Sequence, residues 1–175
     1  MSKIMKNIWS LPRYKREWHN ICALLPAYLP DGCNGSMILY EDGGTEEIKA
    51  SLSWLLDDLL DYLRSNKAVL QQQSSEIAVQ MGKRNKRRLP LILNEAFLLL
   101  PVKARATFNR YHGVDGYVVL PKVANITEQN GKDGCKICFT NQVKLEVLDN
   151  MRTLKNNTIL AKEINAYLRE EKGSA

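Results

Sequence analysis

The sequence predicts an α+β fold: a mainly antiparallel sheet, with two helices inserted after the second strand and one helix at the C-terminal end. Apolar residues recur at helical spacing between residues 48 and 63. Short apolar runs separated by turn residues follow residue 88, and connections this short join antiparallel neighbours. The stretch from about 153 to 170 again places apolar residues on one helical face. Strands grouped in this way favour α+β over a doubly wound arrangement.

The first strands are expected at residues 18–25 and 36–40, on either side of a turn region rich in Pro, Gly, Asp and Asn. A helix over 46–64 follows, and GGTEE predicts its start, with Thr45 as N-cap and two acidic residues in the first turn. Its apolar stripe comprises Ile48, Leu52, Leu55, Leu56, Leu59, Leu60 and Leu63. Three aspartates lie mostly off this stripe and are expected on its solvated face: Asp57, Asp58 and Asp61.

The second helix is expected over 67–81, with Ser74 or Ser75 as a possible N-cap and Gly82 at its end. After residue 88 the pattern indicates strands at 89–93, 97–101, 116–123, 136–139 and 143–148. Thr140, Asn141 and Gln142 separate the last two strands and are typical of a hairpin turn.

Length and composition favour one globular domain. The chain has 175 residues, of which 45% are hydrophobic and 25% charged, enough to bury a core without disulfides. We expect a basic N-terminal arm over 1–17 and a single domain over 18–175. No apolar run reaches the ~18 residues of a membrane span, and four irregularly spaced cysteines fit a reducing cytoplasm.

Positive charge is concentrated in one block, residues 83–122, which holds nine Lys/Arg against two acids, while the whole chain is +6. The candidate DNA-binding residues are Lys83, Arg84, Lys86, Arg87, Arg88, Lys103, Arg105, Asn109 and Arg110. A hairpin between the two clusters would return the chain, so both can lie at the same end of the sheet. Residues 41–76 are net −5, which suggests that the helical side faces water or a protein.

This block supplies the chemistry of nucleic-acid binding. Lys and Arg neutralise phosphates and release counterions, and Arg is favoured in a narrow A·T-rich minor groove. His112 is a candidate for contact with a phosphate or a base, and the alternative is a surface imidazole with no special role. The block therefore predicts binding to double-stranded DNA.

Few features of the sequence support an enzymatic function. The sequence lacks phosphate-loop, dinucleotide, hydrolase and zincin motifs, and we predict no catalytic residue, metal or cofactor. Cys135 and Cys138 form a CxxC, but no second ligand pair exists, and on one strand their side chains would point to opposite faces. A Cys22 nucleophile with His19 or His112 stays open, with nothing specific in its favour.

Several segments resemble the competence transcription factor ComK family. WHNICALLPAYLPDGCNGSMILYEDG (18–43) resembles the family's opening, and LPLILNEAFLLLPVKARATFN (89–109) resembles its central signature. CKICFTNQVKLEVL (135–148), the helix after it and the amides Asn156 and Asn157 resemble its last third. The likeness spans roughly residues 18–170 through loose patterns.

The resemblance implies a transcriptional activator that binds A·T-rich promoter boxes as an oligomer, largely through the minor groove, and switches on DNA-uptake genes. It also implies a DNA-facing role for the loop with Lys103, Arg105, Asn109 and Arg110, and an adaptor–protease partner. Three features depart from the family pattern: QQSSEIAVQ at 72–80, Tyr111 or His112 in place of a tryptophan, and Asn141-Gln142 in the hairpin. We expect the tail used for adaptor-directed proteolysis to be missing or reduced. These departures together leave open a diverged member of the family with altered site preference or no activity.

Two other function classes remain. In an interaction protein, the acidic helix would dock a partner and the basic loops would only solubilise the chain or bind nucleic acid non-specifically. A small nuclease-like or redox enzyme has the least support.

Overall fold

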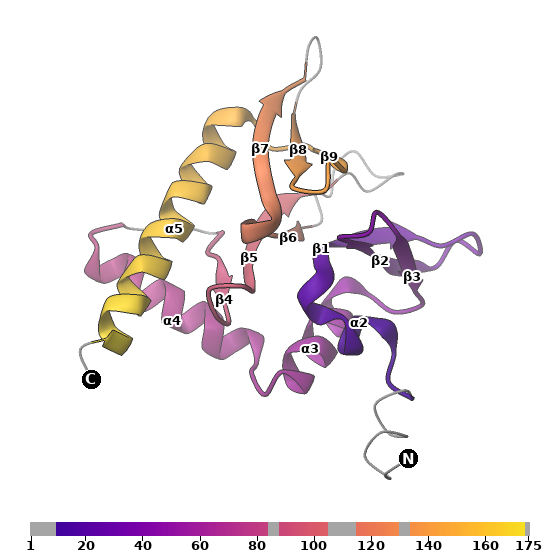
Figure 1. Cartoon of the computed structure of the whole chain (residues 1–175), viewed down its shortest axis with the longest axis horizontal. Helices are drawn as coiled ribbons and strands as arrows, with labels where there is room; N and C mark the ends of the chain where they lie inside the picture. The colour runs from indigo at the N-terminus through magenta and orange to yellow at the C-terminus, as the bar shows by residue number, and fades with distance from the viewer. Residues whose placement is uncertain (1–9, 84–87, 105–114, 130–133, 174–175) are drawn as a thin grey trace.

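The computed structural model describes residues 10–83, 88–104, 115–129 and 134–173. These residues form two antiparallel sheets and the helices that cover them (Figure 1). The six-stranded sheet has the order β3-β2-β1-β6-β5-β4 and the three-stranded sheet the order β7-β8-β9. The strands are β1 (Ile21–Tyr28), β2 (Asn34–Tyr40), β3 (Thr45–Ile48), β4 (Leu91–Ile92), β5 (Leu98–Lys103), β6 (Asp115–Val119), β7 (Val123–Glu128), β8 (Cys135–Phe139) and β9 (Lys144–Val147). The helices are α2 (Arg13–Arg16), α3 (Leu52–Tyr62), α4 (Lys67–Gln80) and α5 (Met151–Gly173), with short 3-10 turns at Trp18–Asn20 and Leu120–Lys122. The predicted α+β class is confirmed.

The boundary of the N-terminal arm differs from the prediction. The arm was expected to reach residue 17, but α2 is packed on the domain and Tyr14 is buried. The Tyr14 hydroxyl donates a hydrogen bond to Asp58 Oδ2 at 2.5 Å, and Lys15 Nζ lies 3.0 Å from the same oxygen. Asp58, expected on a solvated face, is therefore part of this contact.

The start of the first long helix was predicted wrongly. Thr45 begins the edge strand β3, and α3 starts six residues after the expected position, with Ser51 as the N-cap. The Ser51 hydroxyl accepts a hydrogen bond from the Trp54 N–H at 3.2 Å. Five of the seven residues of the predicted stripe are confirmed as the buried face of α3: Leu52, Leu55, Leu56, Leu59 and Leu60. The other two are half-buried outside the helix, Ile48 in β3 and Leu63 at the C-cap.

The second helix, α4, has nearly the predicted span but a different N-cap. Asn66 Oδ1 accepts a hydrogen bond from the Val69 N–H, whereas Ser74 lies buried in mid-helix and donates to the Pro90 carbonyl at 2.7 Å. At the C-terminal end, Gly82 has a φ of +74° and Lys83 N–H bonds the Ala78 carbonyl at 2.8 Å. This is the glycine-terminated helix end that the sequence predicts.

The strand predicted over 116–123 is two strands in different sheets. The 3-10 turn Leu120–Lys122, with Pro121 inside it, separates β6 from β7 and carries the chain from the larger sheet to the smaller one. The hairpin after Phe139 is confirmed, with Gln142 at φ +71°.

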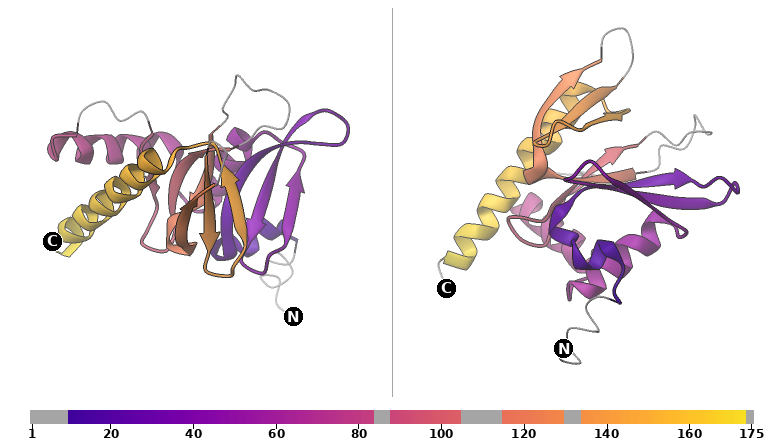
Figure 2. Two further views of the ribbon diagram at one scale, coloured as in Figure 1. Left: turned by 90° about the horizontal axis from the view of Figure 1, so that it is seen from above. Right: turned by 45° about the vertical axis from the view of Figure 1, so that its right-hand side comes forward.

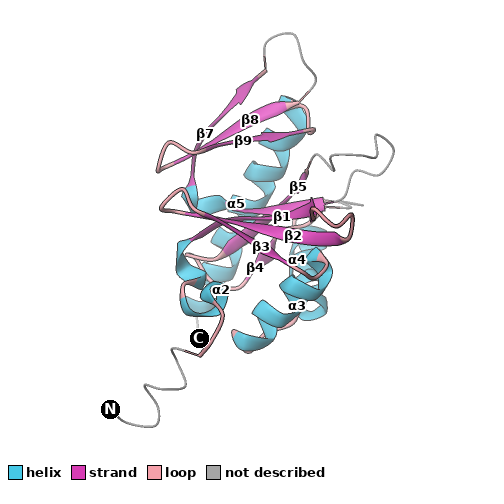
Figure 3. Cartoon of the chain, turned by 90° about the vertical axis from the view of Figure 1, so that its right-hand side faces the viewer, coloured by secondary structure: helices cyan, strands magenta, loops and turns pink. Residues whose placement is uncertain are grey.

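The six-stranded sheet separates two hydrophobic cores. One face packs against α3, and the other packs against β8, β9 and α5. Figures 2 and 3 show this layering, with the three-stranded sheet on the opposite side of the six-stranded sheet from α3. Helix α5 runs from the three-stranded sheet down to the level of α4 (Figure 1). The two sheets also touch through a bridge between Ala104 and Val147.

Candidate nucleic-acid interface

The fold brings the C-terminal end of the first predicted basic segment, at Arg88, near the start of the second, at Lys103. Lys83 and Arg88 flank residues 84–87, and β5 and β6 flank residues 105–114. Lys103 and Asp115, at the ends of those two strands, stand opposite each other in the antiparallel register. The β4–β5 hairpin returns the chain between the two segments, as the sequence analysis expected.

Of the predicted DNA-binding residues, the structure describes Lys83, Arg88 and Lys103. The others fall outside the described residues: Arg84, Lys86, Arg87, Arg105, Asn109 and Arg110. Lys83 and Lys103 are exposed. No described carboxylate forms a salt bridge with either of them.

Arg88 differs from the expectation of a phosphate-facing cation. Its Nη1 donates to Asp149 Oδ1 at 2.6 Å and its Nη2 donates to Asp115 Oδ1. The Arg88 side chain is 18% exposed and the Asp149 side chain 2% exposed. The guanidinium is thus shared between two carboxylates, a geometry suited to the planar fork of arginine.

Asp149 joins the second basic segment to the first. Its Oδ2 accepts the backbone N–H of Lys103 at 2.5 Å, while its Oδ1 accepts Arg88. The Leu148 N–H also donates to the Lys103 carbonyl at 2.8 Å. We call Arg88, Lys103, Asp115 and Asp149 the root clamp, because hydrogen bonds among these four residues hold the end of the first basic segment near the start of the second.

Sequence reasoning missed the role of Asp149. The only local signal is its place before a helix, where Asn150 caps α5 by accepting the Thr153 N–H at 2.8 Å. A buried carboxylate needs a charged or hydrogen-bonded partner, but the sequence does not say which one. Asp149 and Arg88 are 61 positions apart.

The cysteines do not converge on a second site. Cys135 is buried and Cys138 half-buried on β8, in the alternating pattern expected for side chains on opposite faces of a strand. Burial raises the pKa of Cys22 to about 11, with a smaller effect from Glu41, so its thiol is protonated at neutral pH. That protonation argues against the Cys22 nucleophile, and His112 falls outside the described residues.

Within the described part of the chain, no group of three or more His, Cys, Asp or Glu side chains could hold a metal ion. Among the same residues, no helix is both long and apolar enough to cross a bilayer.

Comparison with known proteins adds no family. The sequence matches no protein-family profile, no curated protein and no solved structure.

Proposed function

We propose that this chain is a cytoplasmic, sequence-specific DNA-binding activator of transcription that binds A·T-rich promoter boxes largely through the minor groove. The observation that carries the proposal is the root clamp, which holds the end of the first basic segment, at Arg88, near the start of the second, at Lys103. Positive charge supplied from two adjacent segments can neutralise neighbouring phosphates along one stretch of duplex. The resemblance to ComK proteins supports promoter activation of DNA-uptake genes by an oligomer.

In this proposal Arg88 is a positioning residue, and DNA contact falls to the cations that the clamp presents. Lys83 and Lys103 are exposed, and Lys103 belongs to the clamp through its backbone N–H. Arg105, Asn109 and Arg110 extend the second segment in sequence and remain the candidates for groove contact.

The proposal is tested by fluorescence-anisotropy titration against A·T-rich and G·C-rich duplexes at low and moderate salt. We expect tight A·T-selective binding that survives moderate salt and is abolished by the double charge reversal Arg105→Glu with Arg110→Glu. Equal binding to both duplexes, lost as salt rises, would leave only a non-specific phosphate-seeking surface. Absence of binding at low salt would reject DNA binding and favour a protein-interaction domain.

The role of Arg88 is tested in the same assay with Arg88→Lys, which keeps the charge but lacks the two separate Nη donors that contact Asp149 and Asp115. We expect at least tenfold weaker binding to the A·T-rich duplex. The matched control is Arg152→Lys on the exposed face of α5, which should bind like the unmodified protein. Unchanged affinity in Arg88→Lys would contradict a positioning role.

A further inference from the structure

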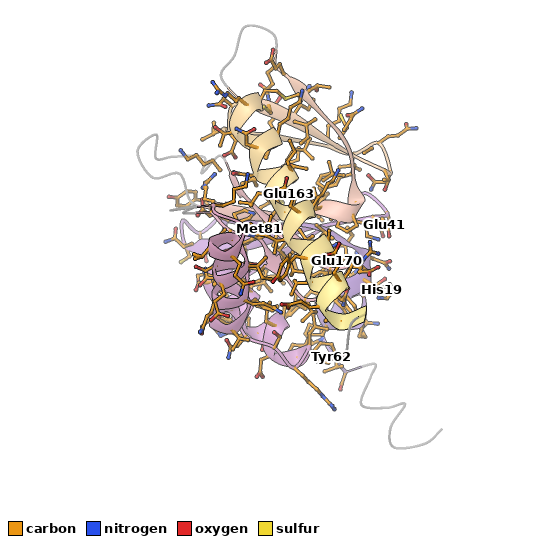
Figure 4. All side chains as sticks on the ribbon, turned by 90° about the vertical axis from the view of Figure 1, so that its left-hand side faces the viewer. His19, Glu41, Tyr62, Met81, Glu163 and Glu170 are labelled. Carbon is orange, nitrogen blue, oxygen red and sulfur yellow. The ribbon has the colours of Figure 1, made fainter. Side chains whose placement is uncertain are left out.

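A cleft of about 400 Å³ lies where the α3–α4 turn, the β4–β5 hairpin and the C-terminal half of α5 meet. In Figure 4 the face with α5 turns toward the viewer, and α4 lies beside it with its Met81 end at the middle of α5. A hydrogen bond from the Tyr167 hydroxyl to Gln80 Oε1 at 2.5 Å ties the two helices. The root clamp contributes no residue to this cleft.

The charges that line the cleft do not cancel. Arg64, Arg169 and Lys172 face one carboxylate, Glu95, so the lining carries an excess of two positive charges. Arg169 holds Glu95 through a two-pronged ion pair, and both side chains are more than half exposed. Hydrogen bonding from Arg169, with a further contribution from Lys172, keeps the pKa of Glu95 below its usual value. Glu95 is therefore ionised at neutral pH.

Arg64 occupies a backbone position that favours glycine. It has a φ of +59°, and the bond from Ser65 N–H to the Leu60 carbonyl closes the end of α3 around it. The end of α4 has the same arrangement, and there the residue is Gly82. Arginine at this position strains the backbone and places a cation at the cleft.

The rest of the lining suits an organic group. Leu70, Ile92 and Leu168 are buried side chains that line the cleft. Gln73 and Asn165 add carboxamide groups, which can both donate and accept hydrogen bonds. Polar and charged residues outnumber the apolar ones in the lining, so the cleft suits a polar, charged compound that makes only a small apolar contact.

We propose that this cleft binds a small phosphomonoester whose organic part is no larger than a nucleoside. A phosphomonoester carries nearly two negative charges at neutral pH and so matches the excess of the lining, whereas a carboxylate brings one. The phosphate lies between Arg64 and Lys172. Arg169 gives up its ion pair with Glu95 and pairs with the phosphate instead. This exchange is favourable because an exposed ion pair is weak. The proposal does not depend on DNA binding.

The proposal is tested by isothermal titration with adenosine monophosphate, ribose 5-phosphate, inorganic phosphate and uncharged adenosine. We expect one site per chain for both phosphomonoesters and at least tenfold weaker binding of adenosine. Inorganic phosphate should bind less tightly than either ester because it lacks the organic part. Binding of free phosphate alone would overturn the organic part of the proposal, and no binding of any phosphate compound at millimolar concentration would overturn all of it.

Three variants locate the site. Arg64→Gly should weaken phosphomonoester binding at least tenfold while leaving the melting temperature equal or higher, because glycine removes the strain. Glu95→Gln should tighten binding severalfold by freeing Arg169, and Lys162→Gln on the exposed face of α5 should change nothing. Equal weakening in Arg64→Gly and Lys162→Gln would mean that the ligand senses only net charge, which would contradict the assigned cleft.

Discussion

Asp58 is the point at which the N-terminal segment is fastened to α3. Its carboxylate accepts the Tyr14 hydroxyl and pairs with Lys15. Desolvation by burial acts to raise the pKa of Asp58, but the hydrogen bonds from Tyr14 and Lys15 outweigh it and hold the pKa below 3.8. Burial, followed by the bond to Asp58, raises the pKa of Tyr14, so the phenol stays protonated as a donor.

This contact predicts an acid-dependent stability. Because the folded pKa of Asp58 is lower than the unfolded value of about 3.9, its contribution is present above that value and is lost as pH falls through the folded pKa. Asp58→Asn should lower the urea midpoint at pH 7 and flatten its decline between about pH 5 and 2, so that the two curves converge in acid. The exposed neighbour Asp57→Asn is the control, and a parallel pair of curves for Asp58→Asn and the unmodified protein would refute the assignment.

Arg88 shows that a charge count cannot distinguish a cation free to contact DNA from one that is paired within the fold. Nine cations in one block single out residues 83–122 as a candidate surface, but the sequence does not reveal which of these cations already have partners. The partner of Arg88 that is buried, Asp149, lies outside the block and far along the chain. Pairing of this kind is decided by tertiary structure, so residue roles are less predictable than the location of a charged region.

At the scale of elements, α3 provides a direct test of its corrected start. Ser51 caps the helix, while Thr45, the residue that the sequence favours, lies in β3. Ser51→Ala should lower the free energy of unfolding by about 1 kcal/mol. Thr45→Ala should change it by less than about 0.5 kcal/mol, as for other exposed positions. Urea denaturation measures both changes. A larger loss of unfolding free energy in Thr45→Ala than in Ser51→Ala would support the predicted helix start at Thr45.

The misplacement of this helix start has a local cause. Glycines followed by Thr-Glu-Glu suit a helix N-terminus, yet they also suit a tight hairpin, and pairing of β3 with β2 decides for the hairpin. Asp42 Oδ1 accepts the Gly44 N–H at 2.8 Å, and Gly43 has a φ of +84°. The leucine stripe and the Gly82 end were predictable because both depend on residues near in sequence.

At the scale of the whole molecule, the α+β class followed from the order of elements, but the division into two sheets did not. Every strand pairing that the structure describes is antiparallel, as the short connections predict. The change of sheet occurs within the predicted strand 116–123, where Pro121 lies in a 3-10 turn. A proline between Leu120 and Lys122 is compatible with an edge strand as well as a turn, so the sequence leaves this choice open.

The shared sheet predicts that the two cores unfold together. Ile164 of α5 is fully buried on one side of the six-stranded sheet, whereas Trp18 packs edge-on against Phe97 on the other. Ile164→Ala should lower the free energy of unfolding by about 3 kcal/mol. We expect the same shift in urea midpoint by far-ultraviolet circular dichroism and by tryptophan fluorescence, because β1 contributes residues to both cores.

Ile159→Ala is the matched control on the same helix. Its side chain is 55% exposed, so the change should cost less than about 0.5 kcal/mol. If Ile164→Ala shifted the circular-dichroism transition but left the fluorescence transition in place, the cores would be separate cooperative units. Coincident transitions would instead mean that loosening α5 is felt across the six-stranded sheet at Trp18 and Phe97, so that both cores belong to one cooperative fold.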